Sequence, residues 1–143
     1  GGPAEGWMMA TIHGSAVRMG GRGLLILGAS GSGKSSLALA LMTLGARLVA
    51  DDRVVLRHLG NGLVAECPAA IRGRIEARGV GIVSVRTRRV ARVALAVACV
   101  PEAVERLPEP QTRRFCGIDL PLLALDPRPA SAVEMVAVAL QTL

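Results

Sequence analysis

The chain has 143 residues, 51% hydrophobic and 20% charged, which is the composition of one globular domain rather than of a disordered segment. Lysine and arginine outnumber aspartate and glutamate by 17 to 11, so the formal net charge is +6, and aromatic residues make up 1% of the chain. A nucleic-acid binder that stacks bases needs exposed aromatic rings, so the composition argues against that class of protein.

Cysteine usage and the apolar runs indicate the cellular compartment. Cys67, Cys99 and Cys116 are widely spaced and fit neither a metal-ligand pattern nor a disulfide framework. The longest apolar run, residues 93–100, is too short to cross a bilayer, and residues 1–8 lack the pattern of a signal peptide. We therefore expect a cytoplasmic domain with free thiols and no membrane partner.

The first half of the chain alternates short apolar runs with glycine-rich turns, as strands joined by turns do. Residues 1–10 are expected to form a flexible leader, in part a remnant of cloning, and residues 11–143 the folded domain. Residues 35–44 favour a helix that ends at Gly45. The strands predicted in this half are 11–17, 22–27, 47–50, 54–59 and 63–66.

The second half predicts more strands and a closing helix. Residues 101–110 are expected to form a polar loop or a short helix. Ser131 and Glu134 have the spacing of a capping box, which predicts a helix from there to Leu140. The pattern as a whole predicts an α/β domain with a mixed sheet and flanking helices. The strands predicted in this half are 81–85, 90–100 and 120–125.

Residues 28–35 form the most specific motif of the chain. They fit the phosphate-binding pattern G-x-x-x-x-G-K-S, with an apolar strand before it and a predicted helix after it. Glycines let backbone N–H groups turn toward phosphate oxygens, and the helix N-terminus adds a favourable dipole. Lys34 suits the β- and γ-phosphates of ATP, and the Ser35 hydroxyl suits Mg²⁺. The predicted nucleotide-binding residues are Gly28, Ala29, Ser30, Gly31, Ser32, Gly33, Lys34 and Ser35.

The alternative to a phosphate loop is a chance glycine-rich turn, because the chain has 17 glycines. Lys34, however, is the only lysine in the chain, and it occupies the lysine position of the motif. We therefore predict that the domain binds a nucleoside triphosphate.

A pair of aspartates, Asp51 and Asp52, directly follows the predicted strand 47–50. The end of a strand that follows a phosphate-loop helix lies at the carboxyl edge of the sheet, beside the phosphates. Neighbouring strand residues point to opposite faces, so the two carboxylates are expected to have different tasks. We predict that Asp52 is the base that accepts the proton of an attacking hydroxyl, with an ordinary acidic turn as the alternative.

These motifs, with two further segments, resemble the C-terminal catalytic domain of bacterial HPr kinase/phosphorylase. The resemblance rests on His13-Gly14, on residues 28–35, on Arg-Leu-Val-Ala-Asp-Asp at 47–52 and on Glu-Ala-Arg-Gly-Val-Gly-Ile at 76–82. A weaker similarity continues to the end of the chain. Members of this family use ATP and Mg²⁺ to phosphorylate a serine of HPr, the phosphocarrier protein of the sugar phosphotransferase system.

The resemblance implies catalytic roles for four residues. Lys34 would contact the phosphates, and Asp52 would accept the proton of the target serine and return it in the reverse reaction. His13 would lie near the aspartates and tune them, and Arg106 would stabilise charge on the phosphoryl group. Without the resemblance, His13 and Arg106 would be predicted as surface residues.

The resemblance also implies a metal site and partners. Ser35 and Glu76 would hold Mg²⁺, although Glu76 alone would be predicted as a solvated partner of nearby arginines. Family members form hexamers, so a homo-oligomer and an HPr-like phosphocarrier partner are implied.

The chain departs from the family in three places. It starts a dozen residues before His13, so it resembles the short proteobacterial form without an N-terminal domain, whose target is an HPr-like carrier of a nitrogen-related phosphotransferase system. Ser84 replaces an acidic residue, and residues 129–132 replace a Pro-Gly-Arg-Asn segment. These differences leave the kinase chemistry intact and the phosphorylase activity in question.

Two other functions are compatible with the motifs: a nucleotide-sensing regulatory module that transfers no phosphate, and a small-molecule P-loop kinase. The arginine-rich stretch from residue 72 to 92 has two interpretations as well. It is either a solvated surface or a docking site that steers a partner by charge.

Overall fold

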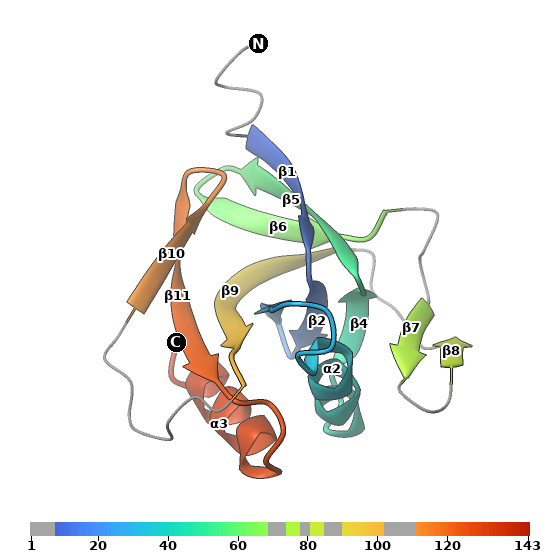
Figure 1. The fold of residues 1–143 in the computed structure, drawn as a ribbon. Coiled ribbons are helices and arrows are strands. Elements are labelled where there is room, and N and C mark those ends of the chain that lie inside the picture. The colour runs from blue at the N-terminus through green and yellow to red at the C-terminus, as the bar shows by residue number, and fades with distance from the viewer. Residues whose placement is uncertain (1–7, 69–73, 78–80, 85–89, 102–110) are drawn as a thin grey trace.

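The computed structural model describes residues 8–68, 74–77, 81–84, 90–101 and 111–143. In this part of the chain, nine strands form a curled mixed sheet, and β7 and β8 form a second, two-stranded sheet (Figure 1). Two helices, α2 (Lys34–Thr43) and α3 (Ser131–Gln141), accompany the large sheet. The strands are β1 (Met9–His13), β2 (Ser15–Met19), β3 (Arg22–Leu27), β4 (Arg47–Ala50), β5 (Arg53–Leu59), β6 (Gly62–Glu66), β7 (Arg74–Ala77), β8 (Gly81–Ser84), β9 (Val90–Cys99), β10 (Gln111–Phe115) and β11 (Ile118–Leu125).

The ten-residue strand β9 organises the large sheet. Along one edge it pairs first with β6, antiparallel, and then with β11, parallel, while its other edge pairs with β3 in parallel. β2 runs antiparallel to both β3 and β4, so β4 runs in the same direction as β3. The carboxyl ends of β3, β4, β9 and β11 therefore lie at one edge of the sheet, where α/β proteins bind their ligands.

Apolar side chains cover both faces of β3. Leu24 and Ile26 belong to a buried cluster that contains Leu37 of α2 and Val136 of α3. Leu25 belongs to a second buried cluster, made with apolar residues of β4, β5 and β6. The uninterrupted apolar run of this strand is therefore explained by burial on both sides.

The end of α2 follows the predicted pattern. The Ala46 N–H donates to the Leu41 carbonyl at 3.2 Å, and the Gly45 N–H donates to the Met42 carbonyl at 3.0 Å, which is the Schellman arrangement. Gly45 has a φ of 102°, a left-handed conformation that glycine adopts without a Cβ clash. The predicted end of this helix at Gly45 is confirmed.

The predicted capping box of α3 is wrong. Ser131 is the first helical residue rather than the cap, and Ala130 at the N-cap position makes no side-chain cap hydrogen bond. The Ala132 N–H donates to the Pro129 carbonyl at 3.0 Å, so the chain already turns ahead of Ser131. Proline fixes its φ near the helical value, which places this turn earlier than the capping pattern predicts.

Most predicted strands are confirmed, including residues 47–50 as β4 and the hairpin of β5 and β6. The predicted strand 11–17 is divided, because β1 pairs with β5 whereas β2 pairs with β3 and β4. β1 also begins at Met9, inside the predicted leader. β10 has no counterpart in the predicted pattern, because its residues are polar and mostly exposed. Residues 102–110, predicted as a loop or short helix, lie outside the described residues.

The fold class, the state of the cysteines and the length of the helices can be compared with the predictions made for the chain. The fold is α/β, as predicted, with both helices packed in the cluster on one face of the sheet. Cys67, Cys99 and Cys116 form no disulfide with one another, in agreement with their spacing. Within the described ranges, neither helix is long and apolar enough to cross a membrane.

Candidate functional site

The phosphate loop connects β3 to α2 at the carboxyl edge of the sheet. Gly28, Gly31 and Gly33 have positive φ angles of 153°, 79° and 100°. A Cβ on Gly28 would lie 2.4 Å from the Ser32 hydroxyl oxygen, and a Cβ on Gly33 would lie 2.8 Å from a ring carbon of Pro127. The loop therefore requires glycine for backbone conformation at three positions and for space at two of them.

The start of α2 fits an anionic group. Its N-cap is Gly33, which makes no side-chain cap hydrogen bond, and its first turn carries no acidic residue. Neither an N-cap side chain nor a carboxylate of the first turn therefore competes with a bound anion for these N–H groups. The buried Ser32 hydroxyl also has no hydrogen-bond partner in the described part of the chain. A buried donor without an acceptor is costly, so a phosphate oxygen is the kind of group this loop lacks.

Lys34 reaches across the loop and is 7% exposed. Its Nζ donates to the Ala29 carbonyl at 2.9 Å, which keeps the ammonium group inside the loop. Its charge also acts on Cys99 at the end of β9. Burial raises the pKa of the Cys99 thiol to about 11, the Lys34 charge opposes this rise, and the Asp126 charge adds to it. Cys99 at the end of β9 is therefore within range of two charges, Lys34 of the phosphate loop and Asp126 directly after β11.

Asp51 is the first residue after β4 and is buried beside the start of α2. Its Oδ1 accepts a hydrogen bond from the Ser35 hydroxyl at 2.9 Å and another from the Ser15 hydroxyl at 2.6 Å. Ser35 lies in the first turn of α2, and Ser15 is the first residue of β2. One carboxylate oxygen thus connects β2, β4 and α2.

Asp52 faces different surroundings from Asp51 and is exposed. It has a φ of 69°, and the Arg53 N–H donates to the Asp51 carbonyl at 2.8 Å, so these three residues form a γ-turn. A positive φ is strained for an aspartate in such a turn, and strain of this kind concentrates at functional sites. The two aspartates differ in environment, as predicted, but the turn separates them rather than the alternation of a strand.

The end of β1 contacts the exposed aspartate. His13 Nδ1 lies 3.4 Å from Asp52 Oδ1, and these side chains are 46% and 65% exposed. The Gly14 N–H donates to the Asp52 carbonyl at 3.1 Å. A Cβ on Gly14 would lie 2.8 Å from the Ile26 carbonyl oxygen, so glycine is needed for β1 to turn into β2 this close to β3. His13, Gly14 and Ser15 therefore each contact one of the two aspartates.

The predicted magnesium site is described in part. Ser35 and Asp51 bring together a hydroxyl and a carboxylate oxygen, hard donors of the kind Mg²⁺ takes alongside substrate phosphates. The described ranges contain no group of three or more His, Cys, Asp or Glu side chains that would hold a metal alone. Glu76 is on β7, which packs against α2, but its side chain lies outside what the structure describes. Arg106 also lies outside the described residues.

Two residues without a predicted role, Ser15 and Pro127, join the site, and so does Asp51, which was predicted to orient a neighbour or a metal-bound water rather than to act as the base. Asp51 had a signal in the sequence, because it adjoins Asp52 at the end of a strand. Ser15 had little signal, since a single serine in an apolar run has many explanations. Pro127 had none, because its contact with Gly33 depends on where β11 ends in space.

Most arginines of the arginine-rich stretch, predicted as either a solvated surface or a docking site, lie outside the described residues. Arg92 is the member whose side chain is described, and it donates to the Asn61 side-chain oxygen at 2.8 Å. The side chains of the other six arginines of the stretch lie outside the described part of the chain.

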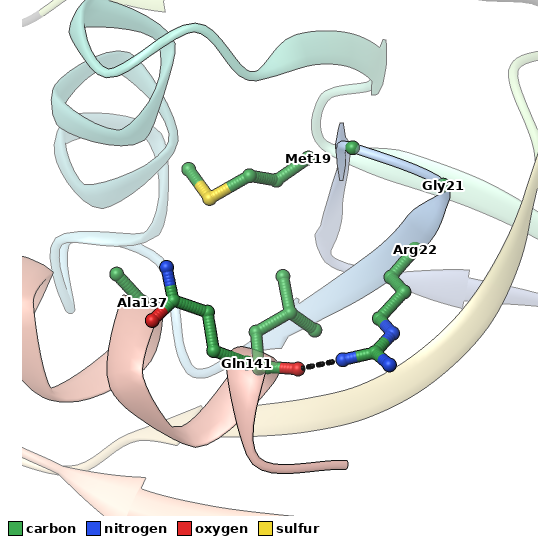
Figure 2. A pocket seen from close by; sticks show the side chains of 7 residues that line it. Met19, Gly21, Arg22, Ala137 and Gln141 are labelled. Atoms are coloured by element: carbon green, nitrogen blue, oxygen red, sulfur yellow. Dashed lines mark hydrogen bonds between the residues drawn. The ribbon is translucent and has the colours of Figure 1, made fainter.

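A hollow of about 420 Å³ lies where the turn after β2 meets the end of α3 (Figure 2). This turn is at the opposite end of β3 from the phosphate loop. Arg22 donates from Nη1 to the Leu140 carbonyl at 2.5 Å and so closes the last turn of α3. None of the predicted site residues lines this hollow. Its lining residues are Met19, Gly20, Gly21, Arg22, Ala137, Leu140 and Gln141.

Comparison with protein families and curated sequences gives consistent matches. Residues 8–139 match the family profile described as HPr Serine kinase C-terminal domain. The HPr kinase/phosphorylase of Lactobacillus acidophilus is 34% identical over 139 residues, which cover 88% of this chain and 43% of that protein. The HPr kinase/phosphorylase of Caldanaerobacter subterraneus is 51% identical over 78 residues, covering 54% of this chain and 26% of that protein. The chain spans less than half the length of these relatives.

The fold also matches a solved structure. The Hpr(Ser) kinase/phosphatase from Coxiella burnetii superposes with a TM-score of 0.82 at 26% sequence identity. The match covers 93% of this chain and 95% of the Coxiella chain. It confirms the predicted α/β fold with a mixed sheet.

Proposed function

The chain belongs to the HPr serine kinase C-terminal domain family, and from this membership we propose that it transfers the γ-phosphoryl group of ATP to a serine of an HPr-like phosphocarrier protein. One observation carries the proposal: Ser35 of the phosphate loop donates a hydrogen bond to Asp51, and the next residue in the chain, Asp52, has an exposed carboxylate. A phosphate loop alone supports nucleotide binding. An accessible carboxylate beside it supplies a base for an acceptor hydroxyl.

The phosphate loop binds and orients ATP. The N–H groups at the start of α2 and the Ser32 hydroxyl donate to phosphate oxygens, and the loop glycines leave room for them. Lys34 exchanges its contact with the Ala29 carbonyl for charge-assisted hydrogen bonds to the β- and γ-phosphates. The backbone N–H groups and the Ser32 hydroxyl are already part of the folded loop, so Lys34 is the group that has to change its partner when phosphate binds.

Ser35 and Glu76 hold Mg²⁺ in this proposal, as the family resemblance implies. When bound, Mg²⁺ neutralises charge that develops on the phosphate oxygens. Asp51 accepts a hydrogen bond from the Ser35 hydroxyl. Because the hydroxyl hydrogen points at Asp51, the lone pairs of Ser35 Oγ remain available for the metal.

Asp52 acts on the acceptor serine. Its exposed carboxylate accepts the serine proton as the serine oxygen forms a bond to the γ-phosphorus and the bond to the β-phosphate oxygen breaks, which leaves ADP. His13, 3.4 Å away, orients this carboxylate, and Arg106 stabilises charge on the transferring group. The reverse, phosphorylase direction is not included in the proposal, because Ser84 and residues 129–132 differ from the family pattern.

The partners and setting follow the family resemblance. We propose an HPr-like carrier as the protein substrate, a homo-oligomer, hexameric in this family, and a cytoplasmic location. The family match over residues 8–139, which includes β1, supports this part of the chain as the catalytic unit.

The test is intact-mass spectrometry of an HPr-like protein from the same genome, incubated with this domain, ATP and Mg²⁺. We expect one added phosphate on a serine. Asp52→Asn should lower the rate by about 10²- to 10⁴-fold, the range of a general base, while ATP binding persists. Lys34→Ala should abolish ATP binding and transfer together. Asp119→Asn removes an exposed carboxylate that pairs with Arg114 on the β10–β11 hairpin, and serves as the matched control.

The outcomes separate the competing functions. An unmodified carrier in the presence of bound ATP would contradict the proposal and favour a nucleotide sensor. Full activity of Asp52→Asn would leave the kinase standing and remove Asp52 as its base.

A further inference from the structure

Two serine hydroxyls converge on one oxygen of Asp51. The Ser15 hydroxyl lies 2.6 Å and the Ser35 hydroxyl 2.9 Å from Asp51 Oδ1. Ser15 is fully buried and Asp51 is 7% exposed, so water competes little for these contacts. Ser15 and Asp51 come from different strands, β2 and β4, and Ser35 comes from α2.

The donor and acceptor chemistry fixes where the protons lie. An ionised carboxylate can only accept hydrogen bonds, so both serines must donate to Asp51. The proton of Ser35 therefore points at Asp51, and its oxygen lone pairs point elsewhere. Since Ser35 lies at the mouth of the phosphate loop, its lone pairs are free for a metal ion bound with the phosphates.

The Ser15 hydroxyl gives Asp51 Oδ1 a second donor beside the Ser35 hydroxyl, and it approaches from a different element. The second donor, Ser15, is anchored in β2, whose next residue, Ala16, pairs with Ala50 of β4. The Ser15 contact therefore ties the carboxylate to the sheet as well as to the start of α2. The 2.6 Å distance is in the short range of hydroxyl–carboxylate hydrogen bonds, which are stronger than neutral ones.

We propose that Ser15 is a positioning residue for magnesium: through Asp51, it holds the Ser35 hydroxyl in the orientation that binds the metal of a metal–nucleotide complex. This inference rests on the proposed nucleotide-dependent function, and it assigns a role to a residue of β2 that lies outside the phosphate-loop and aspartate motifs. In this proposal the fully buried Ser15 acts on the metal site through Asp51 and Ser35.

The test measures metal coupling rather than activity. Calorimetry gives the affinity for a non-hydrolysable ATP analogue with and without Mg²⁺, and the ratio of these affinities is the coupling. In Ser15→Ala we expect affinity without Mg²⁺ to stay within about twofold of wild type and the coupling to fall about tenfold. Ser15→Thr keeps the hydroxyl and should restore most of the coupling. Ser36→Ala removes an exposed hydroxyl from the same helix and should change neither quantity.

A role limited to packing predicts a different pattern. If Ser15 only satisfied a buried carboxylate, Ser15→Ala would weaken binding equally with and without Mg²⁺, or lower the melting temperature alone, and either result would overturn the inference. A wild-type domain whose nucleotide affinity does not respond to Mg²⁺ would overturn it too. Circular dichroism confirms that each variant is folded at the temperature of the titration.

Failure of this inference can be told apart from failure of the proposed function. Phosphate transfer to the carrier by wild type, with normal coupling in Ser15→Ala, would remove the role of Ser15 and keep the kinase. Reduced coupling in Ser15→Ala without any transfer by wild type would keep the role of Ser15 and remove the kinase.

Discussion

Asp51 and Asp52 are adjacent in the chain, yet their side chains differ completely in environment. Asp51 is buried and accepts two hydroxyl hydrogen bonds, while Asp52 is exposed beside His13. The separation comes from the γ-turn at Asp52, in which an L-residue adopts a positive φ. Strain of about 1–3 kcal/mol is typical of such residues, and the surrounding contacts must offset it. The turn thereby gives two adjacent carboxylates different positions, one buried against two hydroxyls and one exposed beside His13.

The loop glycines differ in what a side chain would meet, which gives a paired prediction. Gly31→Ala should destabilise the domain by about 1–2 kcal/mol, because its φ is left-handed but its surroundings are open. Gly28→Ala should cost at least about 1 kcal/mol more, since its Cβ would also collide with Ser32 and approach the Cys99 carbonyl. Urea unfolding without nucleotide measures both values. Equal decreases in the free energy of unfolding for the two variants would show that the contacts around Gly28 do not disfavour a side chain there.

The buried thiol of Cys99 predicts a pH dependence of stability. Its pKa is raised by burial from 9.0 to about 11, so the folded state retains the proton where the unfolded state loses it. This contribution to stability is complete below about pH 9 and is lost as the pH rises through about 11. The chain has no tyrosine and a single lysine, so few other groups titrate in this window.

Denaturant unfolding from pH 8 to 11 tests this dependence. We expect the free energy of unfolding to fall across the window in wild type and to fall less steeply in Cys99→Ala. An unchanged slope in this variant would assign the effect to other groups, among them Cys116, whose pKa is also raised by burial.

Among the elements, the two helices illustrate how packing rather than capping determines position. α3 starts without a side-chain cap, yet its buried residues Ala132, Val136 and Leu140 recur at four-residue spacing and join the same cluster as α2. Burial of this face holds the helix against the sheet. The opposite face leaves Val138 58% exposed.

Two valines of α3 give a matched comparison. Val136→Ala should lower the free energy of unfolding by about 2 kcal/mol, from two buried methyl groups and the cavity they leave. Val138→Ala should change it by less than about 0.5 kcal/mol. Both variants gain the same helix propensity, so the difference between them isolates burial. Similar values for the two would show that α3 is not held by this face.

At the scale of the whole molecule, the site is assembled from segments distant in sequence. The ends of β3, β4, β9 and β11 and the start of β2 meet at one edge, because β4, β3, β9 and β11 run in the same direction and β2 runs opposite to them. A ligand bound there contacts an arrangement that exists only in the folded state. Ligand binding and global stability must therefore be coupled.

This coupling predicts a thermal shift. MgATP at about 100 times its dissociation constant should add about 2.7 kcal/mol to the free energy of unfolding, which corresponds to a rise in Tm of roughly 5–10 °C. Lys34→Ala should lose the shift, and Asp52→Asn should keep it. Differential scanning calorimetry measures these values, and a shift that survives Lys34→Ala would place the nucleotide elsewhere.

The sequence by itself determined the features whose interactions lie within a few residues. The phosphate loop, the Schellman end of α2 at Gly45, the β5–β6 hairpin and the doubly buried strand β3 follow from local conformational preference and apolar pattern. Site residues found through contiguous motifs, such as Lys34 and Ser35, belong to the same class. Local sterics and hydrogen bonds are the same wherever the segment lies in the fold, which is why they can be read from the chain.

Only the tertiary structure decided which side chains meet across the sheet. The bond between Ser15 and Asp51 joins residues 36 positions apart, and it depends on the register of β2 against β4. The contact of Pro127 with Gly33 and the division of the predicted strand at Gly14 depend in the same way on how strands are paired. A shift of one residue in register turns every side chain of a strand to the other face, and no local pattern around Ser15 specifies that register.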